Sequence, residues 1–474
     1  MIRISACVIV KNEEKNIARW LAGIGEIADE KIVVDTGSTD RTVEIARQAG
    51  VEIYNYEWQD DFAAAKNYAL DQATGQWILF LDADEYFEPE TQRQIRQYLE
   101  KIQGNSRIAG LVTAYYNVDT DQHNKLLSRD YQMRIFRHEK KLRYEGAVHE
   151  RVMHQGAGSR IFKMTEFILY HTGYSSHIVQ AKLERNLRLM LEDIDKGVEK
   201  VRYYSPLMDC YYAKKDYVKA AEYARLAIAN TREVIGQTVR QYSCLFDSLK
   251  LMGHSEEELQ AVLNEARAAC PNYPEPLCQQ GYLDYDHGRY DSAEQCLLQA
   301  MQMDQQALDH PEECMDSQMV SSRPYIYWVL GQIQEKKGNL EKAAEYYTQS
   351  LTEYPYQETV LRDWYRLLQQ DDPVHILELL GNFYDRQRDR TFLQQALRAF
   401  PYNKVLLYLL QPDPHSYEAF MAARQYSAAA ACIATELAAL QRDADQLVPQ
   451  GTAEQQLVWQ QLYPVRAAQA EPVR

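Results

Sequence analysis

The sequence predicts a two-part protein, in which an α/β domain is followed by an all-α domain of helical repeats. Strand-like runs alternate with helix-like segments over the first ~180 residues. After about Gln180 the strand signals stop and a repeated helical turn begins. The length of 474 residues suits about three domains of roughly 150 residues each. We therefore expect an α/β domain over 1–180, helical repeats over 181–370 and degenerate helical repeats over 371–440.

Four short apolar runs predict the strands of the first domain, at 4–10, 31–34, 52–56 and 77–81. Segments with helical periodicity lie between them, at 16–27, 41–49 and 61–73. This alternating order predicts a parallel sheet with right-handed crossover connections. Because such sheets bind ligands at the carboxyl ends of their strands, the polar residues that follow each strand are the candidate site residues.

The helical half contains a recurring turn, with copies at 215–220 (KDYVKA), 288–293 (GRYDSA) and 338–343 (GNLEKA) and a degenerate copy that starts at His254. This pattern resembles tetratricopeptide repeats. The small residues Ala220, Ala293 and Ala343 would let the two helices of each hairpin approach closely. Residues 441–474 are rich in Ala, Gln and Asp, and we expect a frayed or disordered tail there.

Charge and composition exclude several classes of protein. The formal net charge is −16, which opposes nucleic-acid binding and a polybasic membrane anchor. No window approaches the ~20 apolar residues of a membrane span, and the first apolar run is broken by Arg3, unlike a signal peptide. The eight cysteines are irregularly spaced without a CxxC pair, which argues against disulfides and zinc. We expect a soluble, cytoplasmic protein.

The run WILFLDADE at 77–85 is the sharpest chemical feature of the sequence. It is a buried strand that ends in two carboxylates, Asp82 and Asp84, whose side chains would point alike if the segment were extended. Carboxylate oxygens suit Mn²⁺ or Mg²⁺, and a metal there would stabilise a diphosphate leaving group. Taken alone, the motif also fits an acidic strand end that only caps the next helix.

Polar residues follow the other strands as well. Asp35 leaves the second strand in VVDTGSTDRT, where Asp40 or Thr39 would cap the next helix. Glu13 belongs to the KNEE turn that closes the first strand. Lys66 lies in DDFAAAKN at the start of the third helix, where it would either reach a phosphate or face solvent.

These four motifs, in this order and spacing, resemble a family 2 glycosyltransferase with a GT-A fold (nucleotide-diphospho-sugar transferase, Rossmann-like) over the first ~175 residues. The resemblance implies a hexosyltransferase that takes a sugar from a nucleotide-sugar donor such as a UDP-sugar, with inversion. It also implies Mn²⁺ or Mg²⁺ bound by the DxD motif, with Asp84 as a metal ligand. The residues that it assigns to donor binding are Val10, Glu13, Asp35, Lys66 and Asp82.

A second match follows in RIFR at 134–137 and EGAVHE at 145–150. It is similar to a subset of the family that includes lipopolysaccharide-core enzymes and sublancin-type, tetratricopeptide-fused peptide S-glycosyltransferases. That resemblance implies His149 as a further metal ligand and Glu150 as the base that deprotonates the acceptor. A core histidine and an N-cap glutamate are the structural alternatives. Arg134 and Arg137 would hold phosphate or pair with acids, and His171 is typical of the subset without an assigned role.

We thus expect a metal-dependent glycosyltransferase whose repeats hold a peptide or protein acceptor, or pair two copies of the chain. A saccharide or lipid-linked acceptor in surface polysaccharide synthesis is the alternative. A non-catalytic scaffold would not need the intact acidic motifs. A dinucleotide-dependent enzyme needs a glycine-rich turn after the first strand, where this chain has KNEE.

Overall fold

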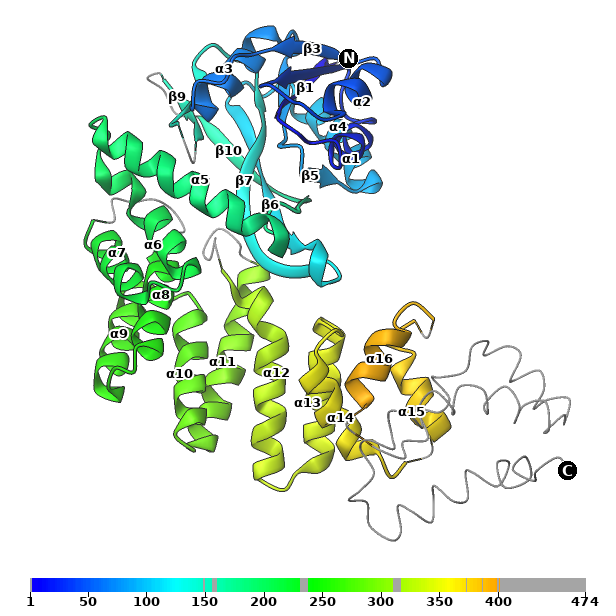
Figure 1. Ribbon diagram of the computed structural model, residues 1–474, viewed down its shortest axis with the longest axis vertical. Coiled ribbons are helices and arrows are strands. Elements are labelled where there is room, and N and C mark those ends of the chain that lie inside the picture. Colours follow the sequence, from blue (N-terminus) through cyan, green and yellow to red (C-terminus); the bar gives the residue numbers. More distant parts are fainter. Residues whose placement is uncertain are drawn as a thin grey trace, which may run out of the picture. The chain divides into compact units, whose positions relative to one another are not determined.

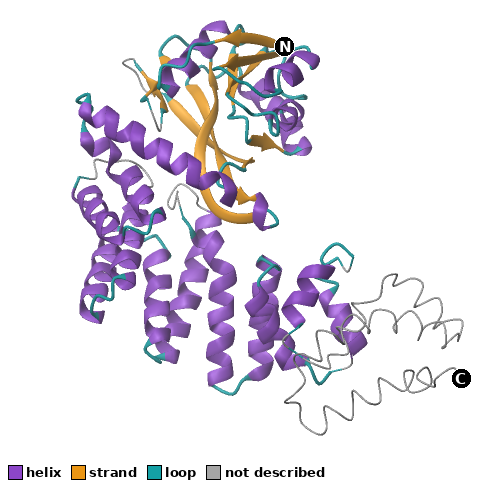
Figure 2. Ribbon diagram, viewed as in Figure 1, coloured by secondary structure: helices purple, strands orange, loops and turns teal. Residues whose placement is uncertain are grey.

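The computed structural model describes residues 2–147, 150–155, 160–230, 238–309, 317–371, 373–385, 387–398 and 400. The chain divides into two compact units, Met1–Ser322 and Arg323–Arg474. The first unit holds a mixed sheet with its covering helices and the first repeat helices (Figures 1 and 2). The expected tail at 441–474 lies outside the described residues.

An eight-stranded sheet forms the N-terminal domain, with the strand order β3-β2-β1-β4-β7-β6-β10-β5. Its strands are β1 (Ile4–Val10), β2 (Glu30–Asp35), β3 (Glu52–Asn55), β4 (Trp77–Phe80), β5 (Glu85–Phe87), β6 (Ile108–Asp119), β7 (Lys125–Arg137) and β10 (Ile161–His171). The two remaining strands, β8 (Leu142–Glu145) and β9 (Arg151–His154), pair as a separate hairpin.

The parallel half of the sheet matches the prediction from sequence. Strands β1 to β4 are mutually parallel, and they lie within a residue or two of the predicted bounds. The predicted helices are also present, as α1 (Ile17–Gly23), α2 (Thr42–Gln48) and α3 (Phe62–Gln72). Asp61 caps α3 by accepting the Ala64 N–H at 2.9 Å.

Beyond β4 the sheet continues with strands that the sequence analysis did not predict, and there it is mixed rather than parallel. Strand β7 runs antiparallel to β4, and β6 runs antiparallel to β7. The long strands β6 and β7 form a hairpin joined by a short 3-10 turn, Thr120–Gln122, so no crossover helix is required between them. Strand β10 then pairs in parallel with β6 and antiparallel with β5.

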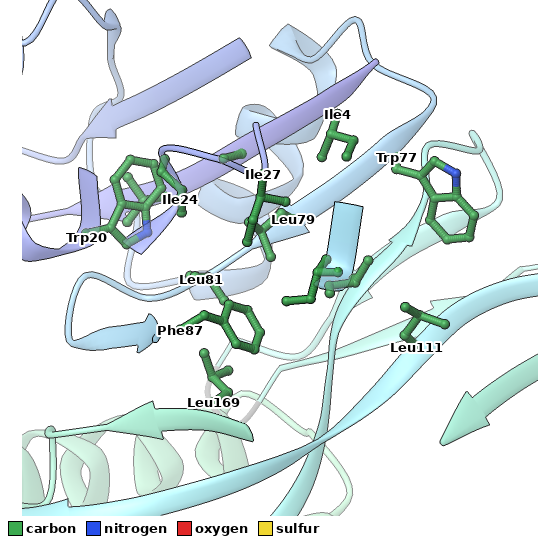
Figure 3. Packing of buried hydrophobic residues seen from close by; sticks show 14 of the residues in the cluster. Ile4, Trp20, Ile24, Ile27, Trp77, Leu79, Leu81, Phe87, Leu111 and Leu169 are labelled. Carbon is green, nitrogen blue, oxygen red and sulfur yellow. The ribbon is translucent and has the colours of Figure 1, made fainter. Parts of the chain in front are cut away.

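Both faces of the parallel strands are covered, as their continuous apolar sequences require. Alternate residues of β1 point to opposite faces, so that Ile4 and Val8 join one cluster and Cys7 the other. Helices α1, α2 and α4 (Pro89–Ile102) contribute to the first cluster, part of which Figure 3 shows around Trp20 and Leu79. Helix α3 and strand β8 contribute to the second. This rigid core fixes the ends of the strands.

Helices make up the rest of the described chain. In the first unit they are α5 (Ser176–Asp195), α6 (Tyr204–Ala213), α7 (Tyr217–Ala229), α8 (Thr238–Leu251), α9 (Glu256–Ala269), α10 (Glu275–Asp286) and α11 (Tyr290–Asp309), with a 3-10 turn at Lys200–Tyr203. Beyond them are α12 (Met319–Lys336), α13 (Leu340–Glu353), α14 (Glu358–Leu368), α15 (Pro373–Leu380) and α16 (Arg390–Leu397). The expected domain boundary at residue 180 falls inside α5.

The predicted repeat turns join consecutive helices. Lys215, Gly253, Gly288 and Gly338 have positive φ values of 61°, 78°, 72° and 81°. Three of these four are glycines, the residue type that adopts this conformation without strain. The small residues one turn later, Ala220, Ala293 and Ala343, are fully buried, as close helix packing requires.

Two expectations from composition can be compared with the described residues. The six cysteines among them, at positions 7, 210, 244, 270, 278 and 296, are all free thiols. In the same part of the chain, no helix combines the length and the apolar character that a bilayer span needs.

Candidate active site

The carboxyl ends of three neighbouring parallel strands bring the predicted site residues to one edge of the sheet. Val10 and Asp35 are in register as the last residues of β1 and β2, and the Thr36 N–H donates to the Val10 carbonyl at 2.9 Å. On the other side of β1, Cys7 is in register with Phe80, the last residue of β4. The segment that leaves β4 carries Asp82 and Asp84.

Asp82 and Asp84 lie in a turn rather than in an extended strand, which corrects the expected geometry. Strand β4 ends at Phe80, and the Glu85 N–H donates to the Asp82 carbonyl at 3.0 Å as the chain reverses into β5. The Glu85 carboxylate in turn accepts the Asp82 N–H at 3.0 Å. Because of this turn, the two aspartates have different partners rather than sharing one.

Lys66 is buried at the centre of the site, so the alternative of a solvated helix face is wrong. Its side chain is 2% exposed, and its Nζ lies 2.8 Å from Asp82 Oδ1 and 2.7 Å from Glu150 Oε1. The rings of Phe80 and Tyr144 flank it at 5.2 and 5.3 Å. Burial opposes the charge of the ammonium group, but Asp82 and Glu150 outweigh this effect and raise the pKa of Lys66 above its ordinary value.

Arg134 pairs with acids, which is one of the two roles expected for it. Its Nη2 lies 2.6 Å from Glu85 Oε1 and 3.4 Å from Asp82 Oδ2. Glu85 is fully buried, and it also accepts the Tyr115 hydroxyl at 2.7 Å. Burial would raise the pKa of Asp82, but Lys66 and Arg134 together hold it below its ordinary value. Asp82 is therefore an anion fixed between two cations.

Arg137 has a structural role in the described chain and lies away from these carboxylates. Its guanidinium donates to the backbone carbonyls of Ile108 at 2.8 Å and of Gln103 at 3.0 Å. It also lies over the ring of Trp77, 4.5 Å from the ring centroid. These contacts tie β7 to the end of α4, so Arg137 is not available for phosphate.

His171, to which the sequence assigned no role, lies beside Asp84. Its Nε2 is 3.5 Å from Asp84 Oδ2, and both side chains are 11% exposed. The Asn117 amide oxygen accepts from His171 Nδ1 at 2.6 Å, and this bond fixes the ring so that Nε2 lies toward Asp84. The ring also stacks on Tyr115 at 5.1 Å. Its position at the last residue of a strand beside the DxD motif is the signal that could have found it.

Asp84 and His171 together fit a divalent metal, because a carboxylate oxygen and an imidazole nitrogen both suit Mn²⁺. Within the described residues, no group of three or more such side chains is gathered at one point. The expected ligand His149 lies outside the described residues, so its assignment stays a prediction. Mg²⁺ and Mn²⁺ sites with one or two protein ligands are normally completed by substrate phosphates and water.

Asp35 and Glu13 border the strand ends where a nucleoside was expected. Asp35 is 7% exposed, and it accepts the backbone N–H groups of Gly37 and Ser38 at 3.3 and 3.1 Å. Glu13 accepts from the Asn16 side chain at 2.8 Å. Their expected contacts with the donor stay predictions.

Asp40 was expected to be structural rather than a ligand. It accepts the Thr42 N–H at 2.9 Å, and it also accepts the N–H of Glu14 at 3.1 Å. These bonds tie the loop after β2 to the turn after β1, and they hold the start of α2 even though Asp40 is not its capping residue.

Glu150 contacts Lys66 and not a helix end. It immediately precedes strand β9, so the alternative of an N-cap glutamate is wrong. Its side chain is 14% exposed, which leaves it accessible from the site. The loop before it is tied to the start of α3, where the Phe62 N–H donates to the Ala147 carbonyl at 2.9 Å.

Comparison with known protein families agrees with this geometry. Residues 5–162 match the model of glycosyl transferase family 2. The N-terminal domain of this chain is therefore similar to family 2 glycosyltransferases. Residues 324–357, which cover most of α12 and all of α13, match a tetratricopeptide repeat. These matches confirm the predicted glycosyltransferase domain and a tetratricopeptide repeat in the helical half.

Curated relatives are similar to parts of this chain. A TPR repeat-containing protein of Synechococcus elongatus is 28% identical over 318 residues, which are 63% of this chain and 76% of that protein. The SPbeta prophage-derived glycosyltransferase SunS of Bacillus subtilis is 32% identical over 193 residues, which are 40% of this chain and 44% of SunS. The second match therefore spans less than half of that relative.

Solved structures align over smaller parts of the chain. Glucosyl-3-phosphoglycerate synthase from Mycobacterium tuberculosis, solved with Mn²⁺ and UDP-glucose, aligns over 24% of this chain and 44% of its own at 21% identity and a TM-score of 0.21. MamA aligns over 37% of this chain and 91% of its own, with 14% identity and a TM-score of 0.29. Neither likeness is close enough to bear on function.

Proposed function

We propose that this glycosyltransferase moves a sugar from a nucleotide-sugar donor to an acceptor nucleophile, with a divalent metal and with inversion. The observation that carries the proposal is the network in which Lys66 joins Asp82 to Glu150 at the carboxyl edge of the sheet. In a family 2 domain this edge is where the donor is expected. The three groups come from the segments around 66, 82 and 150, which converge only in the folded chain.

Donor binding follows from the carboxylates along the strand ends. Asp35 would accept a hydrogen bond from the base or the ribose, with Val10 and Glu13 lining the same pocket. Asp82, held between Lys66 and Arg134, would accept a ribose hydroxyl without having to reorganise. A UDP-sugar is the donor that we propose, on the resemblance of these motifs to the family.

Metal binding would fall to Asp84, together with His171, His149 or both. A bound Mn²⁺ or Mg²⁺ supplies charge neutralisation at the diphosphate leaving group. His171 Nε2 lies 3.5 Å from Asp84 Oδ2, and a hydrogen bond to Asn117 fixes the imidazole ring in this position. The carboxylate and the imidazole would therefore need little movement to meet one ion.

Glu150 is the group that we propose to accept the proton of the acceptor nucleophile. Lys66 holds its carboxylate in place at 2.7 Å, and 14% of the side chain remains exposed, so an acceptor could reach it. One carboxylate suffices for an inverting transfer, because the nucleophile attacks in a single displacement while its proton passes to the base. Lys66 stays charged throughout, since its pKa lies above its ordinary value.

The acceptor that we propose is a peptide or protein side chain held by the helical repeats. Stacked helical hairpins present an extended surface on which a peptide can lie, and the fusion of such a stack to a transferase domain favours a large acceptor. A saccharide or lipid-linked acceptor remains the second candidate. We further propose a cytoplasmic location, and pairing of two copies through the repeats as a second task for them.

A donor-hydrolysis screen tests the proposal. The full chain is incubated with UDP-, GDP-, ADP-, CMP- and dTDP-sugars, each with Mn²⁺, with Mg²⁺ and with a chelator. We expect slow release of nucleotide from at least one donor, lost in the chelator and in Asp84→Ala. A matched surface variant, Lys101→Met on α4, should behave as the wild type, because Lys101 is exposed. Absence of any metal-dependent hydrolysis or binding would refute the proposed activity.

A further inference from the structure

The cations inside the site are already engaged by carboxylates. Lys66 contacts Asp82 and Glu150, and Arg134 contacts Glu85 and Asp82. A donor diphosphate adds negative charge to this acidic edge of the sheet. A divalent metal would offset only part of that charge. A further cation facing the site would therefore stabilise the bound diphosphate.

Arg185 of α5 is such a cation. Its guanidinium lies over the ring of Phe62, 5.3 Å from the centroid, and Phe62 is the first residue of α3, one turn before Lys66. Its Nε and Nη2 donate to the Asn186 side-chain oxygen at 3.2 and 3.0 Å. That partner is a neutral amide of the same helix. A phosphate could take its place as the hydrogen-bond acceptor of Arg185 at a small cost in free energy.

The electrostatic surroundings of Arg185 agree with this position. Partial burial lowers the pKa of Arg185 from its ordinary value, while three carboxylates attract its charge in the opposite direction. These three are Asp84, Glu13 and Glu150, which belong to separate segments of the catalytic domain. The contact with Phe62 at the start of α3 places the guanidinium at the border of the site, on an exposed residue that a ligand can reach.

Helix α5 is held against the catalytic domain at more than one place. The Ser175 hydroxyl, just before the helix, donates to the Thr172 carbonyl at 2.8 Å, and Thr172 directly follows His171. The Ser175 hydroxyl oxygen also accepts the Thr120 N–H at 3.2 Å. Arg185 is therefore carried on an anchored helix and not on a free surface segment.

We propose that Arg185 binds the diphosphate of the nucleotide-sugar donor. The inference rests on the proposed function and extends it to a residue beyond the family match, which ends at residue 162. An arginine fork can donate two parallel hydrogen bonds to phosphate oxygens, which the engaged ammonium of Lys66 does not offer. Since α5 leads directly into the repeat helices, donor binding would then depend on the helical half of the chain.

Calorimetric titration of the full chain with nucleoside diphosphates tests this proposal. UDP, GDP, CDP, ADP and dTDP are titrated in Mn²⁺, and the tightest is taken forward. We expect Arg185→Ala to weaken its binding by roughly 10-fold or more, the range for a lost hydrogen bond between charged groups. Arg185→Lys should recover part of the loss, because it restores the charge but not the fork.

Arg188→Ala is the matched control, because it removes the same type of side chain from the same helix, and Arg188 is 53% exposed and pairs with Glu192 of α5. It should bind the diphosphate within about twofold of the wild type. Unchanged affinity in Arg185→Ala, or an equal loss in Arg188→Ala, would overturn the assignment while leaving the proposed function intact. If the wild type binds none of the five diphosphates, the proposed function fails and the assignment fails with it.

Discussion

Replacement of Lys66 by methionine should destabilise the catalytic domain without opening a large cavity. Lys66 is 2% exposed and holds Asp82 and Glu150 at 2.8 and 2.7 Å. Removing one partner of a buried ion pair costs about 3–5 kcal/mol, because the remaining charges are left uncompensated. The lower end of this range applies to Lys66→Met, because Asp82 would still have Arg134 as an ion-pair partner at 3.4 Å and is 35% exposed. We therefore expect a loss of about 3 kcal/mol.

The pH dependence of this loss has a defined sign. The folded-state pKa of Asp82 lies below its ordinary value, so its contribution to stability is present above the unfolded pKa of about 3.9 and is lost as the pH falls through the folded one. The pKa of Lys66 is raised, so its contribution persists below about pH 10.4. The difference in the free energy of unfolding between wild type and Lys66→Met should be largest near neutral pH, and it should shrink as the pH falls below about 4.

Hydrogen exchange measured by mass spectrometry on peptides that contain β4 is the suitable assay, because it reports on this domain separately from the repeats. A loss of about 3 kcal/mol corresponds to roughly 100-fold faster exchange of the protected amides at pH 7. The exposed-site variant Lys101→Met should change exchange by less than about threefold, within the ±0.5 kcal/mol of ordinary surface substitutions. The reasoning would be refuted if the amides of Lys66→Met exchanged as slowly as those of the wild type. It would also be refuted if the difference in exchange rate between the two proteins grew as the pH was lowered.

Three further predictions concern ligands and turnover. Asp84→Ala should abolish tight Mn²⁺ binding in an electron paramagnetic resonance titration, and parallel titrations of His171→Ala and His149→Ala should show which imidazole is a ligand; full binding in Asp84→Ala would contradict the metal assignment. Asp35→Ala should weaken UDP binding by about 1–3 kcal/mol in calorimetry, and unchanged affinity would leave Asp35 with only its turn. Glu150→Gln should lower kcat by about 100-fold or more with little change in the KM of the donor, whereas near-normal kcat would exclude Glu150 as the base.

The parallel half of the sheet could be predicted because its signals are local. Each of β1 to β4 is a short apolar run bounded by polar or turn residues, and each helix between them has its own periodicity. Strands β6, β7 and β10 are longer, β7 and β10 are only partly buried, and the pairing of all three depends on residues far apart in sequence. Their order in the sheet could not be read from any one segment.

The candidate site was located by its strand ends, but its internal pairing was not predictable. Asp82 and Asp84 were found by their motif, yet the turn that separates their side chains depends on Glu85 and its bond to Arg134, 49 residues away. The ion pair between Lys66 and Glu150 spans a longer separation still. Sequence motifs indicate which residue types meet, whereas the partner of each charge is decided by tertiary contacts.

The charge pairing in the site explains why catalysis and the helical half belong to one chain. Asp82 and Glu150 already hold the ammonium of Lys66, and Glu85 and Asp82 hold the guanidinium of Arg134, so both buried cations of the site are engaged by carboxylates. The guanidinium that faces the site with a neutral partner is Arg185, and α5 carries it. A transferase domain ending where the family match ends, at residue 162, would lack both this arginine and His171. If Arg185 binds the diphosphate as proposed, the segment that connects the sheet to the repeats completes the donor site, and movement of α5 on binding of an acceptor to the repeats would alter donor affinity directly.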